Sequence, residues 1–240
     1  MTEWNGNATF DTEIRVELIK SDASDQMVVN AARVSTQGDD VEAAEALGGN
    51  KGLIRFLMRN RHGSPFEHIG FTWLVTAPIF VWREHMRHRI ASYNEESGRY
   101  TQLKPHFYLP SSVRPLVQVG KPGAYEFVAG TEEQHDLVFG NLAAQSIEAY
   151  ATYVDLLNAG VAKEVARMTL PLNIMSSAYV TMNARALMNF LSLRTKNPDS
   201  AYPSYPQAEI EMVAREYEAA LADYAPLTYQ AFVEFGRVQP

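Results

Sequence analysis

The chain has 240 residues, enough to bury a substantial core as one large domain or two small ones. Its net charge of −7 at pH 7 argues against wholesale binding to nucleic acid, which needs a basic protein face. The sequence contains no cysteine, which excludes disulfides, thiolate nucleophiles and metal centres held by cysteine.

The first 61 residues predict one strand followed by helices. Apolar and polar residues alternate from Glu13 to Ile19, which indicates a half-buried strand. Apolar residues then recur at helical spacing, and capping residues or glycines mark the ends of each helical segment. The expected elements are a loose arm over 1–12, the strand over 13–19, and helices over 27–34, 39–47 and 51–61.

The middle of the chain predicts a strand and a helix that lead into a polar, extended region. A polar turn over 62–68 precedes a run rich in aromatic and β-branched residues, which favours a strand over 69–76. Pro78 suits the first turn of a helix over 79–88. Residues 92–100 are expected to be extended. Prolines and glycines punctuate 101–129, where Phe107-Tyr108-Leu109 forms a small apolar anchor.

The last part of the chain is mainly helical. The longest helix is predicted over 132–158, and Gly160 ends it. The remaining expected elements are a short helix over 162–168, a strand over 174–182, a helix over 183–194, a connector over 195–206, and helices over 207–224 and 226–236. No repeat, low-complexity segment or clear linker divides the sequence, so one mixed α/β domain is the simplest interpretation.

The most polar stretch runs from Arg87 to Tyr100 and contains three arginines, two serines, an asparagine and two glutamates. Guanidinium groups suit phosphate or carboxylate oxygens, and the other side chains add hydrogen-bonding groups. These residue types fit a compact anionic ligand such as a phosphorylated nucleotide. An ordinary solvated face with weak ion pairs fits the composition equally well.

A second polar group lies on the predicted helix over 183–194. Arg185, Asn189 and Arg194 are spaced so that they can line one side of it. Taken alone, this pattern is typical of a solvent-exposed face. Arg167 and the turn over 62–68 complete the set of polar groups.

Other common kinds of site do not match the sequence. Glu84, His85 and His88 are close together, but neighbouring arginines would repel a divalent cation, so no metal site is expected. Ser97 lacks the surroundings of a hydrolase nucleophile. The glycines at 48–52 do not have P-loop spacing, and no Gly-x-Gly-x-x-Gly follows a strand.

The sequence predicts a cytoplasmic protein. Residues Met1 to Asp11 show no basic segment followed by an apolar core, as a signal peptide would require. No apolar run reaches the roughly 18 residues that a membrane helix needs. We therefore expect neither membrane insertion nor secretion.

One long motif spans the arginine-rich run and continues on both sides. It reads Arg87-His88-Arg89-x-x-Ser92-x-Asn94-Glu95-x-Ser97-x-Arg99-Tyr100. The flanking motifs are His62-Gly63-Ser64-Pro65-Phe66-Glu67-His68, Arg167-x-x-Leu170-Pro171, and Asn183-Ala184-Arg185-Ala186-Leu187-Met188-Asn189-Phe190-Leu191-x-Leu193-Arg194. In this order, over about residues 50–212, they resemble the motifs of the flavin-dependent thymidylate synthases.

The resemblance implies both a fold and a reaction. The expected fold is a single α/β (α+β) domain over residues 1–240, with a central, mostly antiparallel sheet flanked by helices. It would assemble as a homotetramer whose active sites are shared between subunits. The implied enzyme converts dUMP to dTMP, with methylenetetrahydrofolate as the carbon donor and NADPH as the reductant of bound FAD.

The same resemblance implies the site residues. Those expected to bind dUMP are Glu84, Arg87, Glu95, Ser97, Gly98, Arg99, Arg167 and Arg194. Arg194 is also expected to be catalytic, because it would contact the uracil edge and favour its ionised form. Those expected to bind FAD are His62, Ser64, Arg87, His88, Arg89, Ile90, Glu95, Asn183, Arg185 and Asn189.

The missing cysteine bears on the mechanism that the resemblance implies. The other route to thymidylate uses a cysteine that attacks the pyrimidine ring, and this chain has none. The reduced flavin would supply the hydride, while the protein would bind and orient the reactants. Arginines near the uracil would stabilise the charge that develops on it.

The chain departs from the family pattern in two places. Residues 195–206 form a longer Pro- and Tyr-rich connector before Gln207-Ala208-Glu209-Ile210, either as a lid or as a longer subunit contact. Glu84 stands where relatives often have glutamine. Two other functions remain as alternatives: a non-catalytic flavin or nucleotide sensor, and an RNA-binding protein that stacks bases on Tyr93 and Tyr100.

Overall fold

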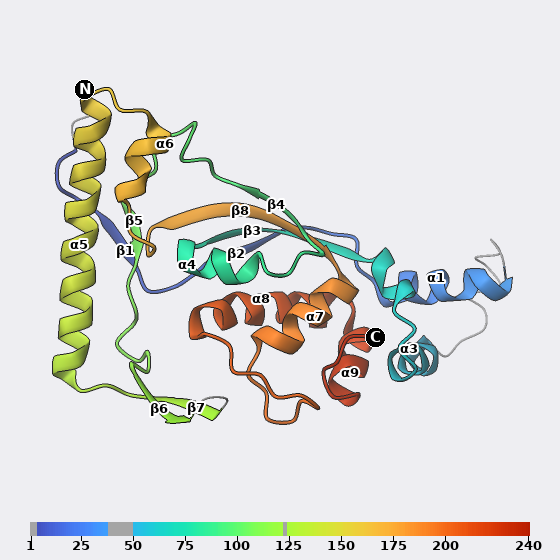
Figure 1. Cartoon of the computed structure of the whole chain (residues 1–240). Coiled ribbons are helices and arrows are strands. Elements are labelled where there is room, and N and C mark those ends of the chain that lie inside the picture. The colour runs from blue at the N-terminus through green and yellow to red at the C-terminus, as the bar shows by residue number, and fades with distance from the viewer. Residues whose placement is uncertain (1–3, 38–49, 122–123) are drawn as a thin grey trace. The chain divides into compact units, whose positions relative to one another are not determined.

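The computed structural model describes residues 4–37, 50–121 and 124–240 (Figure 1). Strands and helices are mixed along these residues, with helices dominating the last third. The strands are β1 (Thr9–Asp11), β2 (Arg15–Ser21), β3 (Gly70–Pro78), β4 (Ser92–Glu95), β5 (His106–Tyr108), β6 (Val117–Lys121), β7 (Ala124–Val128) and β8 (Met175–Asn183). The helices are α1 (Asp25–Gln37), α3 (Asn50–Arg59), α4 (Ile79–His85), α5 (Glu132–Asn158), α6 (Lys163–Ala166), α7 (Ala184–Arg194), α8 (Ala208–Tyr224) and α9 (Pro226–Glu234), with single 3-10 turns η1 (Ser64–His68) and η2 (Arg167–Thr169).

The chain divides into two compact units, each made of three segments. Unit 1 contains Met1–Arg15, Thr76–His85 and Glu95–Ala178. Unit 2 contains Val16–Val75, Met86–Asn94 and Tyr179–Pro240. The single domain over residues 1–240 that the sequence suggested stays a prediction.

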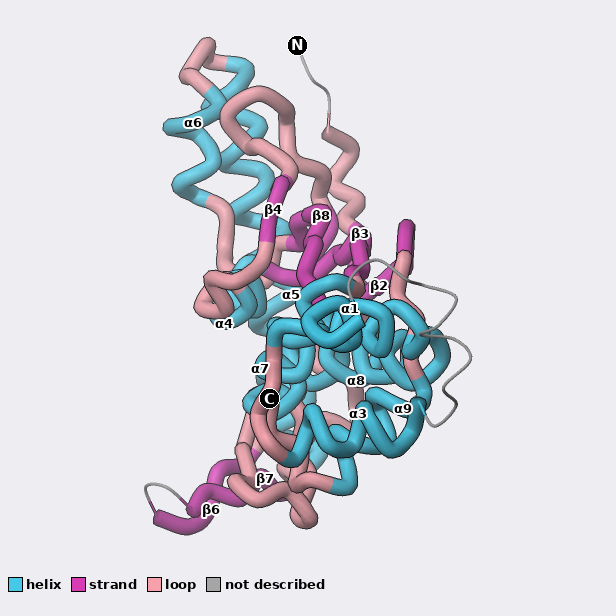
Figure 2. The backbone as a smooth tube through the Cα atoms, turned by 90° about the vertical axis from the view of Figure 1, so that its right-hand side faces the viewer, coloured by secondary structure: helices cyan, strands magenta, loops and turns pink. Residues whose placement is uncertain are grey.

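The main sheet has four strands in the order β2-β3-β8-β4, which Figure 2 shows as successive strands. Thr72 Oγ1 lies 2.9 Å from Thr181 Oγ1, and further along the same strands Thr76 Oγ1 lies 2.8 Å from Ser177 Oγ. The residue number rises on β3 as it falls on β8, so these two central strands are antiparallel. An antiparallel sheet flanked by helices confirms the α/β fold class.

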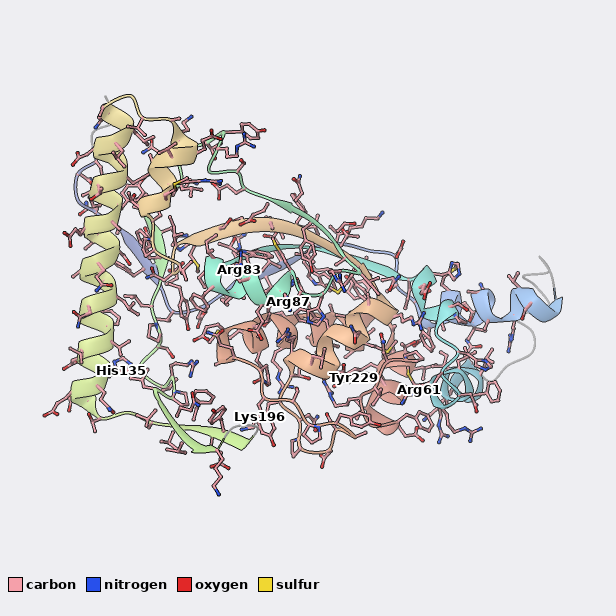
Figure 3. The ribbon with its side chains drawn as sticks, viewed as in Figure 1. Arg61, Arg83, Arg87, His135, Lys196 and Tyr229 are labelled. Carbon is pink, nitrogen blue, oxygen red and sulfur yellow. The ribbon has the colours of Figure 1, made fainter. Side chains whose placement is uncertain are left out.

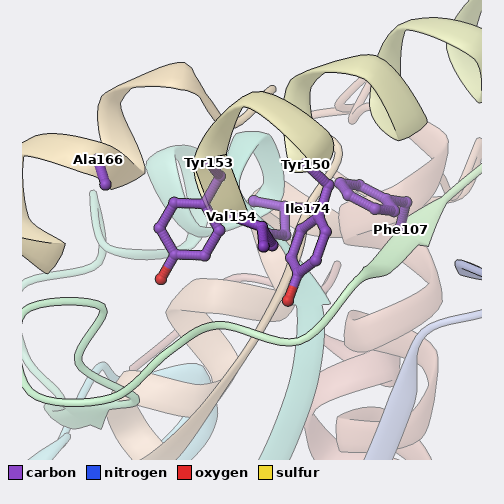
Figure 4. Packing of buried hydrophobic residues seen from close by; sticks show 6 residues of the cluster. All are labelled: Phe107, Tyr150, Tyr153, Val154, Ala166 and Ile174. Atoms are coloured by element: carbon purple, nitrogen blue, oxygen red, sulfur yellow. The ribbon is translucent and has the colours of Figure 1, made fainter. Parts of the chain in front are cut away.

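Unit 1 is built around the long helix α5. Phe107 of β5 packs with Tyr150 and Tyr153 of α5, and Ile174 joins the same buried cluster (Figure 4). At the start of α5, Thr131 and Gln134 form a reciprocal capping box, which satisfies two backbone donors. The buried aromatic rings hold α5 against the segment that leads into β8.

The core of unit 2 joins the sheet to the C-terminal helices. Trp73 of β3 stacks on Tyr217 of α8 with ring centroids 4.0 Å apart. Tyr217 also contacts Phe190 of α7 at 5.5 Å. All three side chains are buried, so α7 and α8 cover the β3 side of the unit 2 sheet with aromatic packing. This packing fixes α7, which carries several of the predicted site residues.

Most of the predicted elements are confirmed. The strands over 13–19, 69–76 and 174–182 and the helices over 27–34, 51–61, 132–158, 183–194, 207–224 and 226–236 all occur with small shifts at their ends. The short helix over 162–168 occurs as α6 followed by η2. The helix predicted over 39–47 lies outside the described residues.

Four local predictions were wrong or incomplete. The extended stretch expected over 92–100 ends with β4 at Glu95, and the chain then turns at Ser97. The arm over 1–12 contains β1, which pairs in parallel with β5 and packs Phe10 against Phe107. The helix expected to reach residue 88 ends at His85, so the arginines that follow lie in a loop. Within 101–129, β6 and β7 form an antiparallel hairpin that the sequence did not suggest.

Among the described residues, no helix combines the length and apolar character that crossing a membrane requires.

Candidate active site

A tight turn in unit 1 gathers four of the predicted dUMP residues. The backbone N–H groups of Tyr100 and Thr101 both donate to Ser97 O at 3.0 Å, which folds the chain back after β4. Gly98 is buried at this turn, and a Cβ there would lie 3.2 Å from Arg167 Cδ. Glycine therefore lets the side chain of Arg167 pass close to the turn. Ser97, Gly98, Arg99 and Arg167 are together in this unit.

The arginine that follows this glycine has an acidic partner that sequence reasoning missed. Arg99 Nε donates to Glu164 Oε2 of α6 at 2.9 Å, and both side chains are about half exposed. Next to this ion pair, Lys163 Nζ donates to Tyr100 O at 3.0 Å. Helix α6 therefore ties the 97–101 turn in place through one charge pair and one backbone contact.

The two predicted acidic residues of unit 1 precede the turn in the chain. Glu95 ends β4, and its Oε1 accepts a hydrogen bond of 2.7 Å from the buried hydroxyl of Ser176 on β8. Glu84 is half-buried in the last turn of α4. Ser176, which carried no signal in the sequence, therefore orients the carboxylate of Glu95.

A cavity of about 280 Å³ in unit 2 gathers another part of the predicted site. The loop after α4, in which Arg87 is labelled in Figure 3, forms one wall, and α7 forms another. The lining combines cationic, amide and apolar side chains. The lining residues are Arg87, His88, Arg89, Ile90, Ala91, Met182, Ala186, Asn189, Leu193 and Arg194.

Two of these residues contact each other directly. Arg194 Nε donates to His88 Nε2 at 2.9 Å, and the His88 ring packs on Phe190 with centroids 4.6 Å apart. Burial, with the nearby charge of Arg194, lowers the pKa of His88 to about 4. Tyr93 donates its hydroxyl to the carbonyl oxygen of His88 at 2.9 Å, and burial raises the pKa of Tyr93 to about 12. Around neutral pH, His88 is therefore uncharged and Tyr93 keeps its proton.

The other predicted FAD residues of unit 2 are not among those that line this cavity. Arg185 Nη1 contacts Glu67 Oε1 at 2.5 Å, and its Nε donates to Pro240 O at 2.9 Å. An ideal Cβ on Gly63 would lie only 2.5 Å from Arg185 Nε, so the turn before η1 approaches this arginine closely. Glu67, which lies inside a motif already singled out, is a partner that sequence reasoning overlooked.

The remaining members of this group have structural contacts of their own. Asn183 caps α7, because its Oδ1 accepts from the N–H of Ala186 at 2.9 Å. His62 packs edge-on against Phe56 at 5.5 Å, and Ser64 begins η1 on the surface. The predicted FAD residues of unit 2 thus fall into a cavity group and a group around η1.

Taken separately, each unit presents arginines suited to anionic ligands. Unit 1 offers Arg99 and Arg167 beside a tight turn, and unit 2 offers three arginines around one cavity. Guanidinium groups bind phosphate and carboxylate oxygens in a fixed geometry, so both sets fit phosphorylated ligands.

Comparison with known proteins decides the family. The sequence model of the family described as "Thymidylate synthase complementing protein" matches residues 17–227. The chain belongs to this family. The resemblance to flavin-dependent thymidylate synthases that the motifs indicated is confirmed.

Relatives of the thymidylate synthase complementing protein family match almost the whole chain. A protein named flavin-dependent thymidylate synthase from Tropheryma whipplei is 56% identical over 232 residues, covering 96% of this chain and 97% of that protein. One of the same name from Streptomyces coelicolor is 54% identical and covers 95% of this chain and 94% of its own length. The crystal structure of a UMP/dUMP methylase, PolB from Streptomyces cacaoi bound with 5-Br UMP, has a TM-score of 0.91 and 50% identity, covering 98% of this chain and 100% of that one.

Proposed function

We propose that this chain is a flavin-dependent thymidylate synthase that methylates dUMP to dTMP. Methylenetetrahydrofolate donates the carbon, and NADPH reduces the bound FAD that supplies the hydride. The observation that carries the proposal is the 56% identity, over nearly the full length of both chains, to a protein of that name. The arginine-rich run from Arg87 to Tyr100 lies inside the matched region.

The unit 2 cavity has residues that fit a flavin dinucleotide. Arg87 and Arg89 can neutralise the pyrophosphate, and the amide of Asn189 can bond to a polar ring edge. Ile90 and Leu193 offer apolar surface to a flat ring system. The residues assigned to FAD are His62, Ser64, Arg87, His88, Arg89, Ile90, Glu95, Asn183, Arg185 and Asn189.

For dUMP, we assign the phosphate to the arginines of unit 1 and the uracil to Arg194. The side chain of Arg167 passes close to the turn at Gly98. This proximity supports the assignment of the phosphate, because it brings hydrogen-bond donors together where a phosphate dianion can bind. The residues assigned to dUMP are Glu84, Arg87, Glu95, Ser97, Gly98, Arg99, Arg167 and Arg194. We further propose a homotetramer in which neighbouring subunits share the active sites.

The chain itself contributes binding and electrostatic stabilisation. It has no cysteine, so a thiolate cannot activate the pyrimidine. The guanidinium of Arg194 stabilises negative charge that develops on the uracil, which is the role that preorganised donors play in many enzymes. Glu95, held by Ser176, can orient a neighbouring arginine or accept a hydrogen bond from a ligand.

Reconstitution tests the proposal. The purified chain should take up FAD and become yellow, and it should form dTMP from dUMP only when both methylenetetrahydrofolate and NADPH are present. Arg167→Met should raise the KM for dUMP, whereas Arg114→Met, at a half-buried arginine of the same unit outside the predicted site, should not. A protein that binds neither FAD nor dUMP contradicts the proposal. Binding of both without dTMP formation identifies the non-catalytic sensor instead.

A further inference from the structure

The contact between His88 and Arg194 connects two residues that are 106 positions apart in the chain. The donor is Arg194 Nε, and the acceptor is His88 Nε2, at 2.9 Å. An arginine always carries its proton on Nε, so the imidazole can only accept. Nε2 must therefore be unprotonated, and the proton of the neutral ring is on Nδ1.

Contacts from α7 and β4 restrain both the ring and the backbone of His88. Its face packs on Phe190 of α7, and the Tyr93 hydroxyl from β4 holds its backbone carbonyl. The charged or titratable groups that face this region are Arg194 from α7, Tyr93 from β4 and the neighbouring Arg87 and Arg89, which line the same cavity. Burial and the charge of Arg194 both favour a neutral imidazole, because a protonated ring would be poorly solvated and repelled by the guanidinium.

We propose that His88 is a positioning residue, whose Nε2 accepts from Arg194 Nε and thereby fixes the plane of the Arg194 guanidinium. A guanidinium held at Nε can no longer rotate about its last bond, so the positions of its terminal N–H groups are also fixed. This role differs from the contact with FAD assigned to His88 above. It rests on the proposed function in one respect, namely that Arg194 meets the uracil of dUMP.

Replacing His88 by glutamine or by asparagine distinguishes a role in positioning Arg194 from simple packing. The Oε1 of glutamine reaches about as far as Nε2 of histidine, whereas the Oδ1 of asparagine reaches only to the level of Nδ1. His88→Gln therefore keeps an acceptor in front of Arg194 Nε, and His88→Asn withdraws it. The kcat/KM for dUMP should fall about 100-fold in His88→Asn, as a misplaced catalytic group implies. The decrease should be clearly smaller in His88→Gln, because this variant keeps the acceptor.

Flavin absorbance and FAD affinity should be measured on both variants. Our proposal predicts that they bind FAD alike and differ in dUMP turnover. Equal losses in the two variants, or losses that follow FAD content alone, would overturn it. If the wild-type protein forms no dTMP, the proposed function fails instead, and the positioning role is then decided by spectroscopy.

Nuclear magnetic resonance of the ¹⁵N-labelled imidazole provides that second readout. In the wild-type protein near pH 7, the proton of His88 should be on Nδ1, with Nε2 showing the shift of an acceptor. In Arg194→Met the pKa of His88 should rise, because a nearby positive charge has been removed. A proton found on Nε2, or a pKa that does not change, would show that the two side chains do not interact as proposed.

Discussion

At the scale of single residues, one arginine assigned to dUMP is already paired with a carboxylate of the chain itself. Arg99 contacts Glu164 across an ion pair in which both side chains are about half exposed. Such exposed pairs contribute only about 0–1 kcal/mol, because water screens them. A phosphate dianion can therefore displace Glu164 from Arg99 at little cost, and the carboxylate acts as a weak internal competitor.

Removing that competitor should strengthen substrate binding. We expect Glu164→Gln to lower the KM for dUMP about two- to fivefold, which corresponds to about 0.5–1 kcal/mol. The free energy of unfolding should fall by no more than about 1 kcal/mol. Steady-state kinetics and urea denaturation measure the two effects.

The matched control for this substitution is Glu148→Gln. Glu148 is an exposed carboxylate on α5 of the same unit, so its loss changes the net charge equally. An equal decrease in KM for both variants would mean that overall charge is responsible rather than the contact with Arg99.

The sequence predicted the arginines of the site but not the residues that hold them. The motif at 87–100 and Arg167 could be identified, because their residue types and spacing resemble a known family. Glu164 and Ser176 could not, because each meets its partner only after segments 65 and 81 residues apart have folded together. An isolated glutamate on a short helix is also typical of an ordinary solvated surface.

At the scale of elements, the turn before η1 is limited by close packing. The backbone of Gly63 is in the ordinary right-handed region, with φ −81°, so an alanine could adopt it. The added Cβ, however, would lie 2.5 Å from Arg185 Nε and 2.7 Å from Pro240 O. Glycine is required there because of its size and not because of its conformational freedom.

Two glycine substitutions should therefore have opposite effects. Gly63→Ala should lower the free energy of unfolding by about 1–3 kcal/mol through overpacking, and should weaken FAD binding by displacing Arg185. Gly52→Ala, inside α3 and with nothing within 4 Å of the new Cβ, should raise it by about 0.5–1 kcal/mol. Urea denaturation compares them, and destabilisation of similar size in both variants would contradict this account.

The strands that could not be predicted from the sequence are short or lack a regular alternation of buried and exposed residues. Four of the five residues of β6 are exposed, so its side chains do not alternate between buried and exposed positions as those of a half-buried strand do. Strand β1 has only three residues, too few for any pattern. The long segments with strong periodicity, α5 and β3 among them, were predicted almost to the residue.

At the scale of the whole molecule, two groups make the folded state sensitive to acid. The pKa of His88 is about 4, compared with 6.5 for an exposed histidine, because burial and Arg194 disfavour its charged form. For Glu218, burial alone would raise the pKa, but the hydrogen bond and charge of Arg237, together with the Tyr229 hydroxyl and the charge of Arg215, outweigh it and lower the pKa from 4.5. Both groups bind protons more readily in the unfolded chain than in the folded one.

Stability should therefore fall as pH decreases. The contribution of His88 is fully present above pH 6.5 and is lost as pH falls from 6.5 towards 4. That of Glu218 is present above its unfolded pKa of 4.5 and is lost below it. Calorimetry should show a decreasing Tm across both ranges, and His88→Gln should flatten the upper range alone. Parallel curves for the wild type and His88→Gln between pH 6.5 and 4 would exclude His88 as the cause.

The order of strands in the main sheet also has a consequence for protein synthesis. Strand β8 lies between β3 and β4, although the ribosome makes it last of the four. Until β8, which begins at Met175, has been synthesised, β3 lacks a neighbouring strand on one side and β4 has no strand to pair with in this sheet. These open strand edges can pair with other chains, so translation of residues 96–174 is the interval in which a chaperone would protect the protein most.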